Sequence, residues 1–263
     1  MSHSFVDIHC HLLPGIDDGA KNWDDTLAMA RMAVEDGTSA IICTPHQLGN
    51  FIHNEGDTIR SLVNEVRERL IAEEIPLSVL PGADIRIEPG MVDRIHRGEV
   101  LSLGDYRRHV LLELPHELYI PLEPILGELT KRKMTGILSH PERNDGILRK
   151  PEIIEPLVEA GCLMQITAGS LCGTMGPACQ TFSEQMLAEG FVHFIASDGH
   201  SPRTRRPLMR RAFVRVAELV DKATAIDLCC RNPAAVAADA PVQSGRRNVV
   251  RRKRGWFARR SVA

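Results

Sequence analysis

Short apolar stretches alternate with helical patterns along most of this chain, and this alternation limits the folds that it can adopt. We expect seven strands, at residues 5–8, 39–43, 77–80, 110–114, 136–139, 163–166 and 193–196. Strands that alternate with helices form a mostly parallel sheet, and nearly continuous apolar strands are typical of a sheet that is buried on both faces. The pattern therefore predicts an α/β protein.

The intervening segments place apolar side chains at helical spacing. Asn22 can cap a helix that starts at Trp23, and Gly37 can end it. A long amphipathic helix is expected around residues 59–70. Further helices are expected at 90–97, 121–132, 151–160, 182–189, 204–222 and 224–237.

Polar side chains stand at or just past the carboxyl ends of the expected strands. They are five histidines and four carboxylates: His9, His11, His46, His140, His200, Asp18, Asp84, Glu113 and Asp198. In a parallel barrel, the carboxyl ends of the strands form one rim, where active sites lie. An open doubly wound sheet would spread the same side chains along a line. The placement therefore favours a barrel with one shared site.

These residue types indicate transition-metal chemistry. His9 and His11 share one face of an extended segment, whereas Cys10 points away. Mixed imidazole and carboxylate ligands favour Mn, Fe or Zn over Ca, and nine donors exceed the needs of one four-coordinate zinc. We therefore expect two or three divalent ions, which would provide hydroxide near neutral pH and clamp a phosphoryl group. Arg143 and Arg205 are natural partners for phosphate oxygens.

Composition excludes several classes of protein. The net charge of the 263 residues is −2, so nucleic acid is not an expected partner. The apolar runs are shorter than the ~18 residues of a membrane helix. The start of the chain lacks the basic and apolar regions of a secretion signal, and seven cysteines without framework spacing suggest reduced thiols. We therefore expect a cytoplasmic protein.

Four motifs resemble those of the PHP (polymerase and histidinol phosphatase) superfamily. They are His9-Cys10-His11 with Asp18, Thr44-Pro45-His46, Ser139-His140-Pro141-Glu142-Arg143-Asn144 and Ser197-Asp198-Gly199-His200. More narrowly, they resemble the manganese-dependent protein-tyrosine phosphatases of capsule and exopolysaccharide operons, the CpsB/CapC type. The resemblance covers residues 5–240 and implies a distorted (β/α)7 TIM-like barrel with a trinuclear metal site, binding Mn²⁺.

The same resemblance implies roles and a substrate. The nine histidines and carboxylates would be metal ligands, and Arg143 and Arg205 would hold phosphate at the catalytic site. The substrate would be the phosphorylated, tyrosine-rich tail of a bacterial tyrosine kinase that controls polysaccharide export. The chain departs from the family at Asp84, where the family usually has Glu. Because Asp is one methylene shorter, Asp84 would reach one ion rather than bridge two.

Other functions remain open on the same barrel. A phosphatase for a small metabolite such as histidinol phosphate is the main alternative. A metal-dependent amidohydrolase is less favoured, because that class typically has a modified Lys where Glu113 stands. A non-catalytic module that binds the kinase tail would require an incomplete metal set. A cysteine-based phosphatase needs Arg six positions after its nucleophile, and none of the cysteines has one.

The end of the chain differs from the rest. We expect residues 1–240 to form the barrel and residues 241–263 to be a basic, disordered tail. The tail contains Arg246, Arg247, Arg251, Arg252, Lys253, Arg254, Arg259 and Arg260 together with Trp256 and Phe257. Such a segment is usually solvated. Attraction to anionic lipid at the inner membrane face is a sharper hypothesis, since it would hold the enzyme near a membrane-bound kinase. Binding of nucleic acid by the tail is a third alternative.

Overall fold

The computed structural model describes residues 4–248, whose strands lie in two parallel sheets. One sheet has the order β1-β2-β4, with β1 (Phe5–Cys10), β2 (Thr38–Cys43) and β4 (Ser78–Pro81). The other has the order β3-β5-β6-β7-β8-β9. Its strands are β3 (His46–Gln47), β5 (Asp84–Arg86), β6 (His109–Glu113), β7 (Thr135–Ser139), β8 (Leu163–Thr167) and β9 (Phe194–Ala196). In each sheet, the spatial order of the strands follows the chain.

The seven predicted strands are confirmed, and two of them continue into the second sheet. After β2, the chain passes Thr44-Pro45 and forms β3, and after β4 it passes Gly82-Ala83 and forms β5. Pro45 has no N–H to donate to a strand ladder, although its carbonyl accepts the N–H of Asp84 at 3.1 Å. A Cβ on Gly82 would lie only 2.7 Å from Cγ2 of Ile42. Pro45 and Gly82 therefore mark where these two strands change sheets.

The first and last strands of the chain meet at their carboxyl ends. Cys10 and Gly199 form an isolated parallel bridge. The N–H of Asp198 donates to the carbonyl of His9, and the N–H of His11 donates to the carbonyl of Gly199, both at 2.8 Å. The predicted α/β class with parallel strands is confirmed. The described residues form two sheets rather than one closed sheet, so the (β/α)7 barrel stays a prediction.

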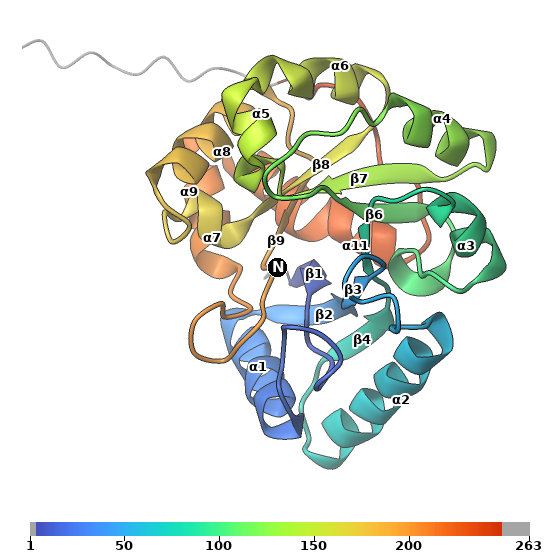
Figure 1. The fold of residues 1–263 in the computed structure, drawn as a ribbon. Helices are drawn as coiled ribbons and strands as arrows, with labels where there is room; N and C mark the ends of the chain where they lie inside the picture. The colour runs from blue at the N-terminus through green and yellow to red at the C-terminus, as the bar shows by residue number, and fades with distance from the viewer. Residues whose placement is uncertain (1–3, 249–263) are drawn as a thin grey trace, which may run out of the picture.

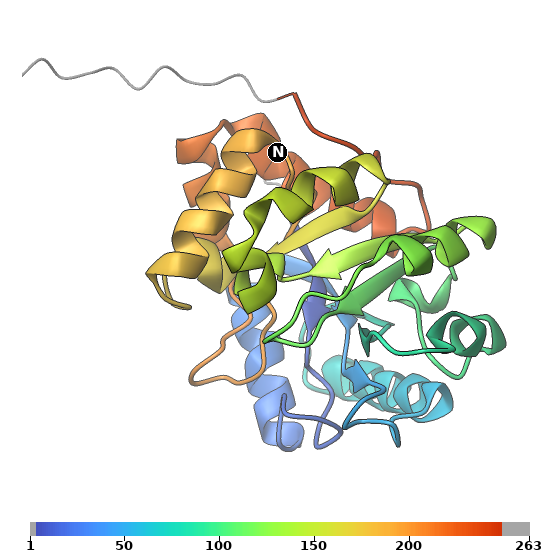
Figure 2. The same ribbon diagram turned by 45° about the horizontal axis from the view of Figure 1, so that its top comes forward.

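Helices surround the strands in both views (Figures 1 and 2). The longer ones are α1 (Trp23–Asp36), α2 (Gly56–Ala72), α3 (Met91–Arg97), α4 (Glu123–Lys131), α8 (Pro177–Glu189) and α9 (Arg210–Leu219). The shorter ones are α5 (Asp145–Arg149), α6 (Ile154–Glu159), α7 (Ala168–Leu171), α10 (Lys222–Ile226) and α11 (Asn232–Ala237). Short 3₁₀ turns occupy Leu103–Asp105, Pro141–Arg143 and Pro151–Ile153, and a π-helical turn, Asp227–Arg231, joins α10 to α11.

The helix ends follow the sequence signals in most places. Asn22 caps α1 by accepting the N–H of Asp25, and Gly37 ends the helix with a φ of 106°. In α2, apolar side chains at helical spacing are buried, each worth ~1.5–3 kcal/mol of unfolding free energy. The helix expected at 204–222 was placed wrongly at its start, because Pro202 and Pro207 keep residues 201–209 irregular and α9 begins only at Arg210.

Residues 241–248 form no helix or strand but contact the domain. Arg247 donates its N–H to the carbonyl of Gly190 at 2.8 Å, and its guanidinium binds Asp227 at 2.7 Å. The guanidinium of Arg246 binds the carbonyl of Glu189 at 2.7 Å. The rest of the predicted tail, residues 249–263, lies outside the described residues. None of the helices that the structure describes is long and apolar enough to cross a membrane.

Candidate metal centre

All nine predicted ligands meet in one cluster, and His46 and Asp84 enter it as the first residues of β3 and β5, just past the carboxyl ends of β2 and β4. The nine ligands come from β1, the loop after it, β3, β5, β6, and the segments that follow β7 and β9. In each of four overlapping groups, potential ligand atoms lie within 4.8 Å of one another. The groups are His11, Asp18, His46 and His200; His9, His11 and Asp84; His9, His140 and Asp198; and His46, Asp84 and Glu113. Segments up to 191 residues apart thus converge on one site.

The two histidines of the first strand are held by acceptors behind them. His9 and His11 are fully buried, and their Nε2 atoms lie 3.2 Å apart. Nδ1 of His9 contacts Oε1 of Gln165 at 2.8 Å, and Nδ1 of His11 contacts Oδ2 of Asp17 at 2.7 Å. Because both partners accept, each Nδ1 carries the proton, and each Nε2 keeps a lone pair for a metal ion.

Asp84 provides a test of whether these residues fit a cation. Both of its carboxylate oxygens are buried and have no hydrogen-bond partner among the described residues, and the same holds for Nδ1 of His46. Oδ2 of Asp84 lies 3.5 Å from Nε2 of His9 and 3.6 Å from Nδ1 of His46. A buried carboxylate without partners is costly unless a cation or another donor satisfies it. The donor set therefore fits divalent ions, and Asp84 belongs to two of the four groups despite its shorter side chain.

Burial keeps two nitrogen donors of the cluster, those of His11 and His140, neutral. Burial holds the pKa of His11 well below its usual range and lowers the pKa of His140 to about 4. Neutral imidazoles are the form that coordinates metal. Such groups therefore need no deprotonation before a cation binds near neutral pH.

The carboxylates of the cluster divide into two kinds. Contact with the His200 imidazole, 3.4 Å away, lowers the pKa of Asp18 to about 2. Burial opposes ionisation of Asp198, but His9 and Arg205 outweigh it and hold the pKa of Asp198 well below its usual range. Burial and the charge of Asp84 raise the pKa of Glu113 to about 9. A cation would relieve this repulsion between Asp84 and Glu113.

Arg143 and Arg205 border the cluster from two different loops. Arg143 lies in the 3₁₀ turn after β7 and Arg205 in the loop after β9, and both bind Oδ2 of Asp198. The opposite oxygen of Asp198 lies 3.3 Å from Nε2 of His9. The structure thus places both predicted phosphate-binding arginines at the metal centre, and their role at phosphate stays a prediction.

Two of the candidate ligands have a strained backbone. His140 has a φ of 32° and Asp198 a φ of 50°, in the left-handed region that residues with a Cβ seldom adopt. His140 also precedes Pro141, a position that favours extended backbone. Strain of this kind persists where the surrounding structure holds it, and it is common at functional sites.

Sequence reasoning missed three side chains that hold the cluster from outside. They are Gln165, Asp17 and Asp7. Asp7 accepts the hydroxyl of Ser197 at 2.5 Å and its N–H at 3.0 Å, and so fixes the turn before Asp198. Asp7 was detectable, because it shares the alternating face of β1 with His9. Gln165 carried no such signal, since a glutamine in a buried strand has no typical spacing to a ligand.

Two rings stack against outer ligands of the cluster. Phe51 stacks on His46 with ring centroids 5.2 Å apart, and His116 stacks on His140 at 5.7 Å. Phe51 is half-buried and His116 is exposed, so both reach the border between the centre and solvent. The border of the cluster thus carries aromatic rings.

Comparisons with known proteins agree with this geometry. The family model described as "Capsular polysaccharide synthesis, CpsB/CapC" matches residues 5–238. Tyrosine-protein phosphatase YwqE of Bacillus subtilis (strain 168) is 39% identical over 202 residues, which cover 76% of this chain and 79% of that protein. Tyrosine-protein phosphatase CpsB of Streptococcus pneumoniae is 25% identical over 242 residues, which cover 89% of this chain and 98% of that protein.

A solved structure extends the agreement to three dimensions. It comes from work on YwqE of Bacillus subtilis and CpsB of Streptococcus pneumoniae, described as unique metal-dependent tyrosine phosphatases. It matches this fold with a TM-score of 0.87 and 33% sequence identity, over 94% of this chain and 100% of that chain. From the family match and the identity to YwqE, the chain belongs to the CpsB/CapC family of capsular polysaccharide synthesis.

Proposed function

We propose that this protein is a metal-dependent protein-tyrosine phosphatase that removes phosphate from a bacterial tyrosine kinase of capsular or exopolysaccharide synthesis. The observation that carries the proposal is the convergence of nine imidazole and carboxylate donors into four overlapping groups. The names of the relatives supply the reaction class, and the aromatic border formed by Phe51 and His116 suits an aryl phosphate.

The nine donors would hold two or three divalent ions, for which we propose Mn²⁺, with Fe or Zn as alternatives of similar ligand preference. When bound, such ions activate water as a nucleophile and neutralise charge on the phosphoryl oxygens. Gln165 and Asp17 orient the imidazoles of His9 and His11. Arg143 and Arg205 are placed to donate to phosphate oxygens, and they would keep one contact each with Asp198 while doing so. The phenolate of tyrosine has a pKa near 10 and so leaves with modest proton assistance.

Two further parts of the proposal concern fold and location. We propose that the two sheets together make the distorted (β/α)7 barrel, because β3 and β5 continue β2 and β4 and the ends of β1 and β9 are bridged. We also propose a cytoplasmic enzyme, held at the inner membrane face by its basic end. The basic residues at positions 251–260 of the sequence support that idea through their attraction to anionic lipid.

Hydrolysis of a phosphotyrosine peptide after exhaustive chelation tests the reaction. We expect turnover to vanish and to return with Mn²⁺. Full activity of the chelated protein would end the proposal. Histidinol phosphate in the same assay tests the alternative substrate class, because a kcat/KM above that of the peptide would favour a small-metabolite phosphatase.

A further inference from the structure

A cavity of about 180 Å³ lies beside the metal centre, between the segments that follow β8 and β9. Its walls come from α7 and the turn after it, from Ser197, and from the loop of residues 201–209 with the start of α9. Arg205 lines this cavity and also binds Asp198 of the metal centre. The cavity and the centre therefore share one guanidinium group.

The cavity has three arginines in its wall and no carboxylate. Within residues 4–248, Arg206 and Arg211 make no ion pair, and Nε of Arg205 is buried without an acceptor. The apolar part of the wall is formed by Ala168, Cys172, Met175 and Leu208. One guanidinium group can donate two parallel hydrogen bonds to the oxygens of a carboxylate or phosphate. The cavity thus suits an anionic group carried on an apolar stem.

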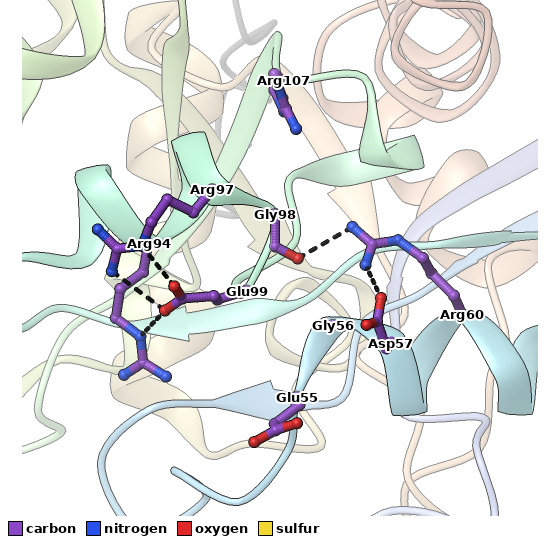
Figure 3. Close-up of a pocket in the computed structure, with 9 residues that line it drawn as sticks. All are labelled: Glu55, Gly56, Asp57, Arg60, Arg94, Arg97, Gly98, Glu99 and Arg107. Carbon is purple, nitrogen blue, oxygen red and sulfur yellow. Dashed lines mark hydrogen bonds and ion pairs between the residues drawn. The ribbon is translucent and has the colours of Figure 1, made fainter.

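A second arginine-rich cavity, of about 320 Å³, shows the contrast (Figure 3). It lies between the start of α2 and the end of α3, and three of its four arginines are already paired, Arg107 being the exception among the described residues. Arg94 and Arg97 bind Glu99 at 3.3 and 2.5 Å, and Arg60 binds Asp57 at 2.7 Å. Carboxylates of the wall compensate three of the four arginine charges in this cavity, whereas the wall of the cavity beside the metal centre has no carboxylate.

We propose that the cavity lined by Arg205, Arg206 and Arg211 binds an anionic side chain of the substrate peptide, close in sequence to the phosphotyrosine. This inference rests on the proposed phosphatase function. An extended peptide advances about 3.3–3.6 Å per residue. Arg205 belongs to the wall of the cavity and also binds Asp198 of the metal centre, so a residue one to three positions from the phosphotyrosine can reach the cavity while the phosphotyrosine lies at the centre. The carboxylate of Asp or Glu and the phosphate of a second phosphotyrosine have the chemistry that the arginines recognise.

A peptide series with Mn²⁺-loaded enzyme tests the subsite. Each peptide has a phosphotyrosine at a fixed central position. One of the three positions on either side of it is then varied between Glu, Gln and a second phosphotyrosine. We expect Glu to raise kcat/KM about fivefold over Gln at one or two adjacent positions. The phosphotyrosine arm shows which anion the cavity prefers. Arg206→Gln and Arg211→Gln should each bring the Glu-to-Gln ratio toward one.

Arg203→Gln is the matched control, because Arg203 lies exposed in the same loop but does not line the cavity. It should keep the wild-type ratio. If Arg203→Gln lowered the Glu-to-Gln ratio of kcat/KM as much as the cavity variants do, the preference would come from diffuse surface charge. That result would overturn the proposed subsite. Equal kcat/KM for Glu, Gln and phosphotyrosine peptides at every position would also overturn it. p-Nitrophenyl phosphate distinguishes failure of the subsite proposal from failure of the proposed phosphatase function. It has no peptide to fill the cavity, so its hydrolysis shows that the metal centre works even when the subsite proposal fails.

Discussion

Nδ1 of His9 lies 2.8 Å from Oε1 of Gln165, 156 residues away in the chain, and both side chains are fully buried. The amide oxygen accepts the Nδ1 proton, so the opposite nitrogen of the ring faces the other ligands with its lone pair. One hydrogen bond between β1 and β8 thus sets the form of an imidazole at the centre.

Gln165→Leu should lower Mn²⁺ affinity and kcat/KM by about 10–100-fold, the usual cost of losing a partner behind a metal ligand. The leucine cannot accept the Nδ1 proton, so His9 is free to change tautomer or rotate. Calorimetric titration with Mn²⁺ and phosphopeptide kinetics measure the two effects. Gln165→Glu, which keeps an acceptor, should retain more affinity than Gln165→Leu. Equal affinities of Gln165→Leu and wild type would show that the contact does not position His9.

Asp84→Asn should reduce activity by more than the 10–100-fold typical of residues behind the ligands. The amide loses the charge that lies between His9 and His46, while its size is almost unchanged. Elemental analysis should show fewer Mn²⁺ ions per chain, because Asp84 belongs to two of the ligand groups. Unchanged metal content would mean that the ions are held without Asp84.

The convergence of these side chains could be predicted because they follow strand ends, a position that the alternation of strands and helices reveals; their role as metal ligands stays a prediction. His9 and His11 were visible from a period of two, and Asp198 and His200 from their place after the last strand. Gln165 and Asp17 were not, since they act across the structure and their residue types are common in ordinary turns and strands. The pairing between strands also could not be predicted from the sequence. The change of sheet after β2 and β4 therefore appears only in the structure. Loop 201–209 is a different case, because Pro202 and Pro207 are visible in the sequence and oppose a helix there despite the helical spacing.

Binding of Mn²⁺ should raise the melting temperature. The ligands come from segments spread over residues 9–200, so they form a site only in the folded chain. Mn²⁺ at 100 times its Kd adds ~2.7 kcal/mol of unfolding free energy, which corresponds to about 5–10 °C for a chain of this size. Scanning calorimetry of the chelated protein, with and without Mn²⁺, measures the shift. Ca²⁺ is the control, because sites rich in imidazole disfavour it. Equal shifts with both cations would argue against this site.

Gly19→Ala should destabilise the protein and weaken metal binding. A Cβ at Gly19 would lie 2.3 Å from the carbonyl oxygen of His11 and 2.9 Å from Oδ1 of Asp17. The loop must therefore move, and with it the acceptor that orients His11, at a cost of about 1–3 kcal/mol. Gly127→Ala in α4 is the matched control, because nothing lies within 4 Å of its added Cβ. That variant should gain about 0.5–1 kcal/mol. Urea unfolding and Mn²⁺ titration of the two variants test this, and equal stability would contradict it.

Stability should fall between pH 7.5 and 5.5 in part because of His193, which lies away from the metal centre. His193 is buried, its Nδ1 accepts the N–H of Met164 at 3.0 Å, and its Nε2 contacts the carbonyl of Gly245 at 3.0 Å. The ring is thus held neutral, and burial lowers its pKa from 6.5 to about 4. Below pH 6.5, His193 binds a proton in the unfolded chain but stays neutral in the folded chain. Its contribution to the free energy of unfolding is therefore complete above pH 6.5 and declines toward pH 4.

His193→Gln removes this titration and should flatten the pH dependence of unfolding. From the two pKa values, wild type loses about 1 kcal/mol through His193 between pH 7.5 and 5.5, and the variant does not. Urea unfolding at both pH values, with chelator present so that metal binding does not contribute, measures the difference in slope. The variant has lower stability at pH 7.5 because it loses the two contacts of the ring, so the slope is the test rather than the stability itself. Parallel lines for the two proteins would show that His193 titrates alike in the folded and unfolded chains.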